Sequence, residues 1–102
     1  MNTEKPFAER MREDRRLLLL RLLHEAVAYR ANSSVLHSWL HSYGLASSRD
    51  DVNADLAWLK DRGYIGLEIV IPGVYVATLS ASGMDVATGH AVVPGVSRPS
   101  PK

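Results

Sequence analysis

The fold is decided by residues 47–89, which read SSRDDVNADLAWLKDRGYIGLEIVIPGVYVATLSASGMDVATG. The stretch opens with two serines, Ser47 and Ser48, either of which can cap a helix. Apolar residues then recur at helical spacing, at Val52, Leu56 and Leu59. Gly63 follows, where a left-handed residue commonly ends a helix. The first part of the stretch therefore predicts a helix.

The rest of the stretch changes its period. Residues 64–71 and 74–79 are rich in β-branched and aromatic side chains, and Pro72-Gly73 between them is a turn signal. Ser80 then caps a short helix that runs to about Thr88 and stops at Gly89. These signals predict a β-hairpin followed by a last helix.

Two further helices are expected upstream. Residues 7–30 consist largely of strong helix formers with no Gly or Pro, and predict one long helix that starts near Thr3 and Pro6. Its wide leucine stripe fits either burial on two sides within one domain or packing against a second subunit. A cap at Asn32–Ser34 begins a helix over residues 34–43, which Gly44 ends.

This order of elements describes a helix-turn-helix followed by a wing. We therefore expect a mainly helical α+β fold, with one winged-helix domain over residues 1–89. Residues 90–102 contain three prolines and little to bury, and predict a flexible tail.

Residues 52–65 (VNADLAWLKDRGYI) resemble the recognition helix and wing start of winged-helix regulators of the ArsR and MarR kind. The segment LSASGMDVA at residues 79–87 is similar to the Leu-Thr-x-x-Gly segment that follows the wing in those families. The resemblance covers about residues 15–89 and extends to the small ArsR-like proteins of Mu-like transposable phages. It implies a dimeric module that binds double-stranded DNA and regulates transcription, with the third helix in the major groove.

The resemblance also implies which side chains contact DNA. Asn53 is suited to adenine, and Arg49 is suited to guanine or to a phosphate. The implied DNA-binding residues are Ser48, Arg49, Asn53, Ala54, Ala57 and Lys60.

The distribution of charge favours an alternative. The whole chain has a net charge of only +1, with 12 Lys and Arg against 11 Asp and Glu. Residues 47–62 hold three basic and four acidic side chains, and residues 64–79 hold Glu68 with no Lys or Arg. Such a surface repels phosphates and releases few counterions. The same fold can instead be a protein–protein interaction module whose contact surface includes Trp58 and the uncharged hairpin.

Basic residues are more numerous in residues 1–30, which hold seven Lys and Arg against five Asp and Glu. They make either a solvated face of paired charges or an arm that contacts phosphates. Because the signs alternate, we favour the solvated face.

Catalytic and metal-binding motifs are scarce. The chain contains no cysteine, and no phosphate-binding glycine loop or hydrolase motif is present. His37 and His41 stand four residues apart on the second helix, a spacing that suits two metal ligands, but no carboxylate in that helix completes the set. We therefore expect no enzyme activity, no cofactor and no metal site.

The N-terminal region mixes charges of both signs, unlike a secretory signal, and no apolar run approaches the roughly 20 residues that span a bilayer. We expect a cytoplasmic protein without membrane contact.

Overall fold

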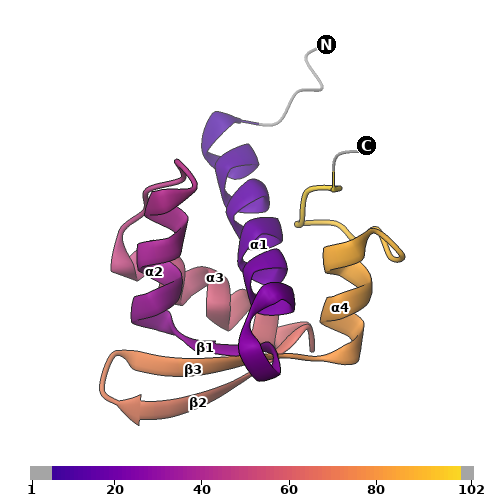
Figure 1. The fold of residues 1–102 in the computed structure, drawn as a ribbon. Helices are drawn as coiled ribbons and strands as arrows, with labels where there is room; N and C mark the ends of the chain where they lie inside the picture. Colours follow the sequence, from indigo (N-terminus) through magenta and orange to yellow (C-terminus); the bar gives the residue numbers. More distant parts are fainter. Residues whose placement is uncertain (1–5, 100–102) are drawn as a thin grey trace.

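The computed structural model describes residues 6–99 and has α+β architecture (Figure 1). Its elements follow one another as α1 (Phe7–Glu25), the 3-10 turn η1 (Val27–Tyr29), β1 (Arg30–Asn32), α2 (Ser33–Ser42), α3 (Arg49–Asp61), β2 (Ile65–Ile71), β3 (Val74–Leu79) and α4 (Ala81–Thr88). Thr3, the proposed start signal of the first helix, lies outside the described residues; Pro6 is the N-cap of α1.

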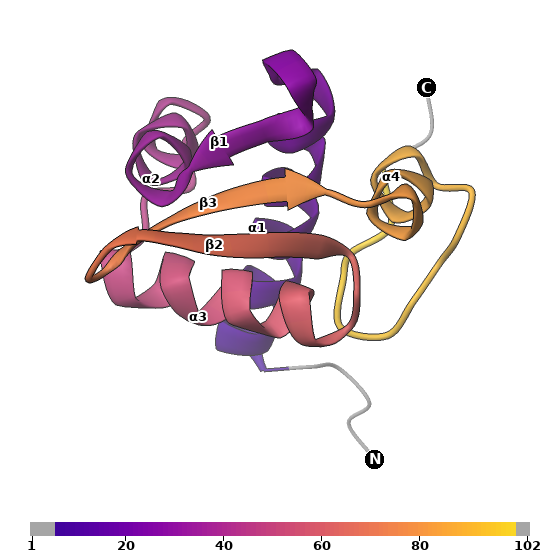
Figure 2. The same cartoon turned by 90° about the horizontal axis from the view of Figure 1, so that it is seen from below.

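The three strands form one antiparallel sheet in the order β1-β3-β2. The helices lie on one side of this sheet, and Figure 2 shows α3 running alongside β2. Strands β2 and β3 pair from Ile65 opposite Leu79 to Ile71 opposite Val74, with a bulge between Ile69 and Ile71. The predicted hairpin is confirmed, its first strand beginning one residue later than expected.

The core is built around α1. Leu19, Leu20 and Leu23 are fully buried by side chains from α2, α3 and the sheet, among them Leu36, Leu40, Val52, Leu56 and Leu59. Burial of each such side chain contributes about 1.5–3 kcal/mol. Leu17 and Leu22 are also buried within the chain, so the wide stripe of α1 packs mostly inside its own domain. None of the helices within residues 6–99 combines the length and apolar character needed to cross a bilayer.

The prediction of one helix over residues 7–30 is wrong at its C-terminal end. The helix ends at Glu25, and Ala28 and Tyr29 both adopt a φ of 58°. The following residues form β1, in which Arg30 pairs with Thr78 and Asn32 with Val76. Helix propensity is a local quantity, and here pairing with a distant strand outweighs it.

The other helix boundaries follow their local signals. The side chains of Asn32, Ser48 and Ser80 accept backbone N–H bonds of 2.8, 3.0 and 3.0 Å from residues three positions later, and so cap α2, α3 and α4. Helix α2 begins at Ser33, one residue before the expected start. Gly44 and Gly89 have positive φ angles of 79° and 86° at the ends of α2 and α4. The caps predicted at these positions are confirmed.

Residues 90–99, part of the tail expected beyond residue 89, bury more of their surface against the rest of the chain than their composition indicates. Val96 is only 6% exposed, and the Ser97 N–H donates to the Glu13 carbonyl at 3.2 Å. Residues 90–99 therefore return from α4 to pack beside α1, and the remaining tail residues, 100–102, lie outside the described chain. Proline suits this irregular path because it has no backbone N–H that would need a hydrogen-bond partner.

Candidate nucleic-acid interface

Helix α3 brings the six predicted DNA-contacting residues to the surface. Asn53 is partly exposed, and the exposed members are Ser48, Arg49, Ala54, Ala57 and Lys60. Ser48 has a structural role as well, because its hydroxyl accepts the Asp51 N–H at 3.0 Å and caps the helix. The two alanines leave the middle of the exposed face without long side chains, which permits close approach by another surface.

One flank of α3 faces the β2–β3 hairpin. The Asn53 Nδ2 donates to the carbonyl of Gly73 in the hairpin turn at 3.5 Å. At about 100° per residue, Arg49 and Lys60 share this flank with Asn53, whereas Asp50 and Asp61 lie on the outer face. Arg49 Nη1 also donates to the Ser34 hydroxyl of α2 at 3.0 Å, in an exposed bond that water can replace. The flank beside the hairpin is therefore the basic side of α3.

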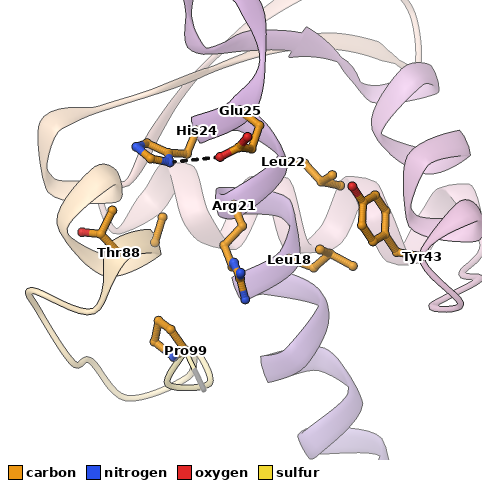
Figure 3. Close-up of a pocket in the computed structure, with 9 residues that line it drawn as sticks. Leu18, Arg21, Leu22, His24, Glu25, Tyr43, Thr88 and Pro99 are labelled. Atoms are coloured by element: carbon orange, nitrogen blue, oxygen red, sulfur yellow. Dashed lines mark ion pairs between the residues drawn. The ribbon is translucent and has the colours of Figure 1, made fainter. Parts of the chain in front are cut away.

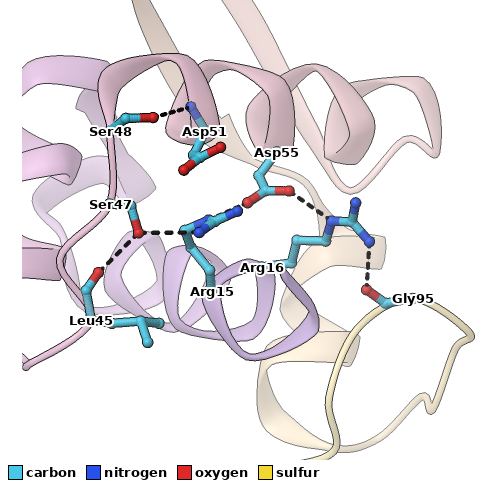
Figure 4. A network of polar contacts seen from close by, with 8 residues as sticks. All are labelled: Arg15, Arg16, Leu45, Ser47, Ser48, Asp51, Asp55 and Gly95. Atoms are coloured by element: carbon cyan, nitrogen blue, oxygen red, sulfur yellow. Dashed lines mark hydrogen bonds and ion pairs between the residues drawn. The ribbon is translucent and has the colours of Figure 1, made fainter. Parts of the chain in front are cut away.

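A buried ionic network joins α1 to α3 (Figure 4). The carboxylate of Asp55, 1% exposed, accepts from Arg15 Nε at Oδ2 and from Arg16 Nε at Oδ1, the latter at 2.9 Å. Arg15 Nη1 also donates to the Ser47 hydroxyl at 3.2 Å. Two guanidinium groups thus hold one carboxylate, whose charge is paired and hydrogen-bonded where it is buried.

Sequence reasoning missed this network. Asp55 was counted among the acids of a groove-facing helix, yet it points inward toward α1. The signal available was its position next to the apolar stripe of Val52, Leu56 and Leu59, but nothing local identifies Arg15 and Arg16 as its partners. Neither interpretation of the α1 charges describes these two arginines, because both are mostly buried and bound to Asp55.

Burial of Asp55 changes the surface charge of α3. From residue 49 to 62, Asp55 is the one charged side chain that is buried. The exposed charges are then three basic, Arg49, Lys60 and Arg62, against three acidic, Asp50, Asp51 and Asp61. The exposed surface of the helix is neutral rather than negative.

Trp58 differs from the exposed anchor that the interaction-module hypothesis requires. The guanidinium carbons of Arg16 and Arg62 both lie 4.0 Å from the indole ring centroids. Gly95 packs so closely that a Cβ there would lie 2.4 Å from Trp58 Cζ2. Trp58 is therefore a partly buried support between α1, α3 and residues 90–99.

The tip of the hairpin is apolar and exposed. Ile69, Val70 and Ile71 are 74%, 58% and 57% exposed. Glu68, the acidic residue of the hairpin, forms an exposed ion pair with Arg30 of β1 at 3.3 Å. The tip therefore presents apolar side chains, with its nearest acid paired.

His37 and His41 lie on α2, the first partly buried and the second exposed. Within residues 6–99, no three side chains of the His, Asp or Glu type gather as a metal site would require.

An open groove of about 590 Å³ lies on α1 between Tyr43 and α4 (Figure 3). Leu18 and Leu22 line it with Arg21, and His24 Nδ1 lies 3.8 Å from Glu25 Oε2 at one end. We call this surface the α1–α4 groove.

Comparison with known proteins identifies relatives by sequence. No family model matches the chain, and no solved structure matches it. The uncharacterized protein gp26 of Escherichia phage Mu is 43% identical over 90 residues, which cover 88% of this chain and 92% of gp26. An uncharacterized protein of Haemophilus influenzae is 37% identical over 82 residues, covering 80% of this chain and 79% of that protein. At this identity and coverage, the chain belongs to the same family as gp26 of phage Mu.

Proposed function

We propose that this protein is a winged helix-turn-helix regulator of transcription that binds double-stranded DNA and is encoded by phages or prophages. The order α1-β1-α2-α3-β2-β3-α4 supports the fold, since α2 and α3 make the helix-turn-helix and β2–β3 follows as a wing. The relationship to a phage Mu protein supports the phage origin.

The observation that carries the proposal is the burial of Asp55. With this carboxylate held by Arg15 and Arg16, the exposed charges of residues 49–62 balance, and Arg49, Asn53 and Lys60 share the flank next to the hairpin. A duplex that approaches along this flank meets two cations and an amide, while Asp50 and Asp61 lie on the neighbouring outer face, so the electrostatic objection to DNA binding is reduced.

Each of these side chains would make a different contact with DNA. Asn53 would read adenine through two hydrogen bonds, and Arg49 would contact guanine or a phosphate near the start of the helix. Lys60 would contact a phosphate, and Ala54 and Ala57 would let the helix backbone approach the groove. The 3.5 Å bond from Asn53 to Gly73 is long enough to exchange for a base contact.

We further propose a homodimer that uses α1 and α4, with the α1–α4 groove at its interface. Two copies would present two α3 helices to half-sites about 34–36 Å apart, or multiples of that spacing.

The experiment selects preferred sequences from a pool of random duplexes and compares variants on the selected and scrambled duplexes. Asn53→Ala should reduce the discrimination between them by roughly 5- to 150-fold, the equivalent of about 1–3 kcal/mol per lost base contact. Lys60→Gln should weaken binding to the selected duplex and to the scrambled duplex to a similar extent. Arg10→Gln, which changes an exposed cation near the start of α1 and outside the α1–α4 groove, serves as the control. Equal effects of Lys60→Gln and Arg10→Gln, with discrimination unchanged by Asn53→Ala, would contradict the proposal.

A second candidate function is that of a protein-interaction module, which the exposed apolar tip at Ile69–Ile71 favours. A pull-down with the purified chain that recovers only DNA, and loses it in Asn53→Ala, would exclude this candidate.

A further inference from the structure

The most exposed apolar surface of the hairpin is its tip. Three consecutive β-branched residues, Ile69, Val70 and Ile71, each expose more than half of their surface. Isolated exposed apolar residues are ordinary, but a contiguous group beside a candidate binding surface indicates contact with a partner.

The hairpin segment that forms the tip carries no charge of its own. Residues 69–80 contain no acidic or basic side chain, and the preceding Glu68 is paired with Arg30 at 3.3 Å. Most wings hold phosphates with basic side chains, but this tip has none. If the tip contacts DNA, its favourable contacts must be with the apolar faces of bases rather than with the backbone.

The tip also lies beside the basic flank of α3. The Asn53–Gly73 hydrogen bond of 3.5 Å joins the hairpin turn to that flank, and Figure 2 shows the turn near the end of α3 where the helix begins. Arg49 and Lys60 on the same flank are complementary in charge to a duplex. A duplex held by these cations therefore reaches the tip, and this charge complementarity favours DNA over a protein as its occupant.

The tip is built to be stiff. β-branched side chains have few rotamers, and Pro72 fixes the backbone at the turn. The bulge between Ile69 and Ile71 increases the local twist of the strand. Side chains of this kind serve as wedges in proteins that separate base steps, because they lose little entropy on insertion.

We infer that the hairpin tip is an apolar wedge, which inserts Ile69 or Ile71 between two base pairs from the minor groove and bends the duplex. This inference rests on the proposed DNA binding. Wedges of this type bend DNA by roughly 20–90° toward the major groove. Insertion is easiest at pyrimidine–purine steps, which unstack at low cost.

The test measures binding and bending together, with dyes at the two ends of short duplexes. One probe is a mixed-sequence duplex rich in TA and CA steps; the other is a homopurine–homopyrimidine duplex that contains no pyrimidine–purine step. Wild-type protein should increase energy transfer between the dyes on the first probe and bind it about tenfold more tightly than the second.

The variant that removes the inserted side chain, Ile69→Ser or Ile71→Ser, should abolish the change in energy transfer on the first probe and bring its affinity close to that of the second. Val92→Ser is the matched control, because Val92 is 58% exposed and belongs to residues 90–99, a segment that Figure 1 shows beside α4, away from the hairpin turn. Circular dichroism verifies that each variant is folded.

The outcomes separate this inference from the function on which it rests. Binding of wild-type protein without bending, or bending that both tip variants retain, would overturn the wedge and leave DNA binding intact. Absence of binding to either duplex would overturn both proposals.

Discussion

Arg16 Nε donates to Asp55 Oδ1 at 2.9 Å, and Arg16 Nη1 donates to the Gly95 carbonyl at 3.0 Å, so one guanidinium joins α1 to both α3 and residues 90–99. The same guanidinium packs on Trp58. The orientation of α3 on the core therefore depends on Arg16 and Asp55 as well as on its leucines.

Removal of the carboxylate should strongly destabilise the fold. Asp55→Ala removes the carboxylate that pairs with the buried guanidinium of Arg15 and the partly buried one of Arg16, which costs roughly 3–5 kcal/mol of unfolding free energy. Urea denaturation measures the cost. Asp61→Ala removes an exposed acid of the same helix and should change stability by no more than about 0.5 kcal/mol. Similar values for the two variants would show that the network contributes little.

The packing of residues 90–99 should depend on Gly95, which lies against the ring of Trp58. Gly95 has a φ of +91°, and an alanine Cβ would lie 2.4 Å from Trp58 Cζ2. Gly73, with a φ of +85°, has open space around the position of a Cβ. Both alanine variants share the backbone strain, so Gly95→Ala should cost about 1–3 kcal/mol more than Gly73→Ala. Tryptophan emission should also change in Gly95→Ala. Equal costs would mean that the segment moves aside freely.

Self-association should depend on the α1–α4 groove. Tyr43 is exposed and lines this groove, whereas the exposed Phe7 does not. Tyr43→Ser should weaken dimerisation by about tenfold in sedimentation equilibrium, the equivalent of about 1.4 kcal/mol. Phe7→Ser should have little effect. A wild-type chain that stays monomeric at every concentration would rule out the proposed dimer.

Much of the fold could be predicted because its signals are local. The caps at Asn32, Ser48 and Ser80 and the turn at Pro72-Gly73 act within a few residues of the chain. Strand β1 could not be predicted, since residues 30–32 are extended only through pairing with β3. The Asp55 network joins side chains about 40 positions apart, which no periodicity reveals.

The residues of the candidate site could be predicted from the sequence, but the net charge of its exposed surface could not. Helical spacing predicts Ala54 and Ala57 on the face opposite the apolar stripe, and Arg49, Asn53 and Lys60 on one flank. The structure leaves Asn53 partly exposed and the other four exposed. The same spacing could not determine that Asp55 is neutralised from α1, or that the hairpin turn contacts Asn53. Both features depend on packing between elements.

The most direct measurement is the affinity of the purified protein for a mixed-sequence duplex across a series of salt concentrations. If Arg49 and Lys60 of each copy in a dimer contact phosphates, the logarithm of the association constant should fall linearly with the logarithm of salt, with a slope of about −3 to −4. Saturable binding with that slope is the predicted result. Failure to bind at low salt, or an affinity independent of salt, would contradict the central claim that this flank of α3 binds DNA.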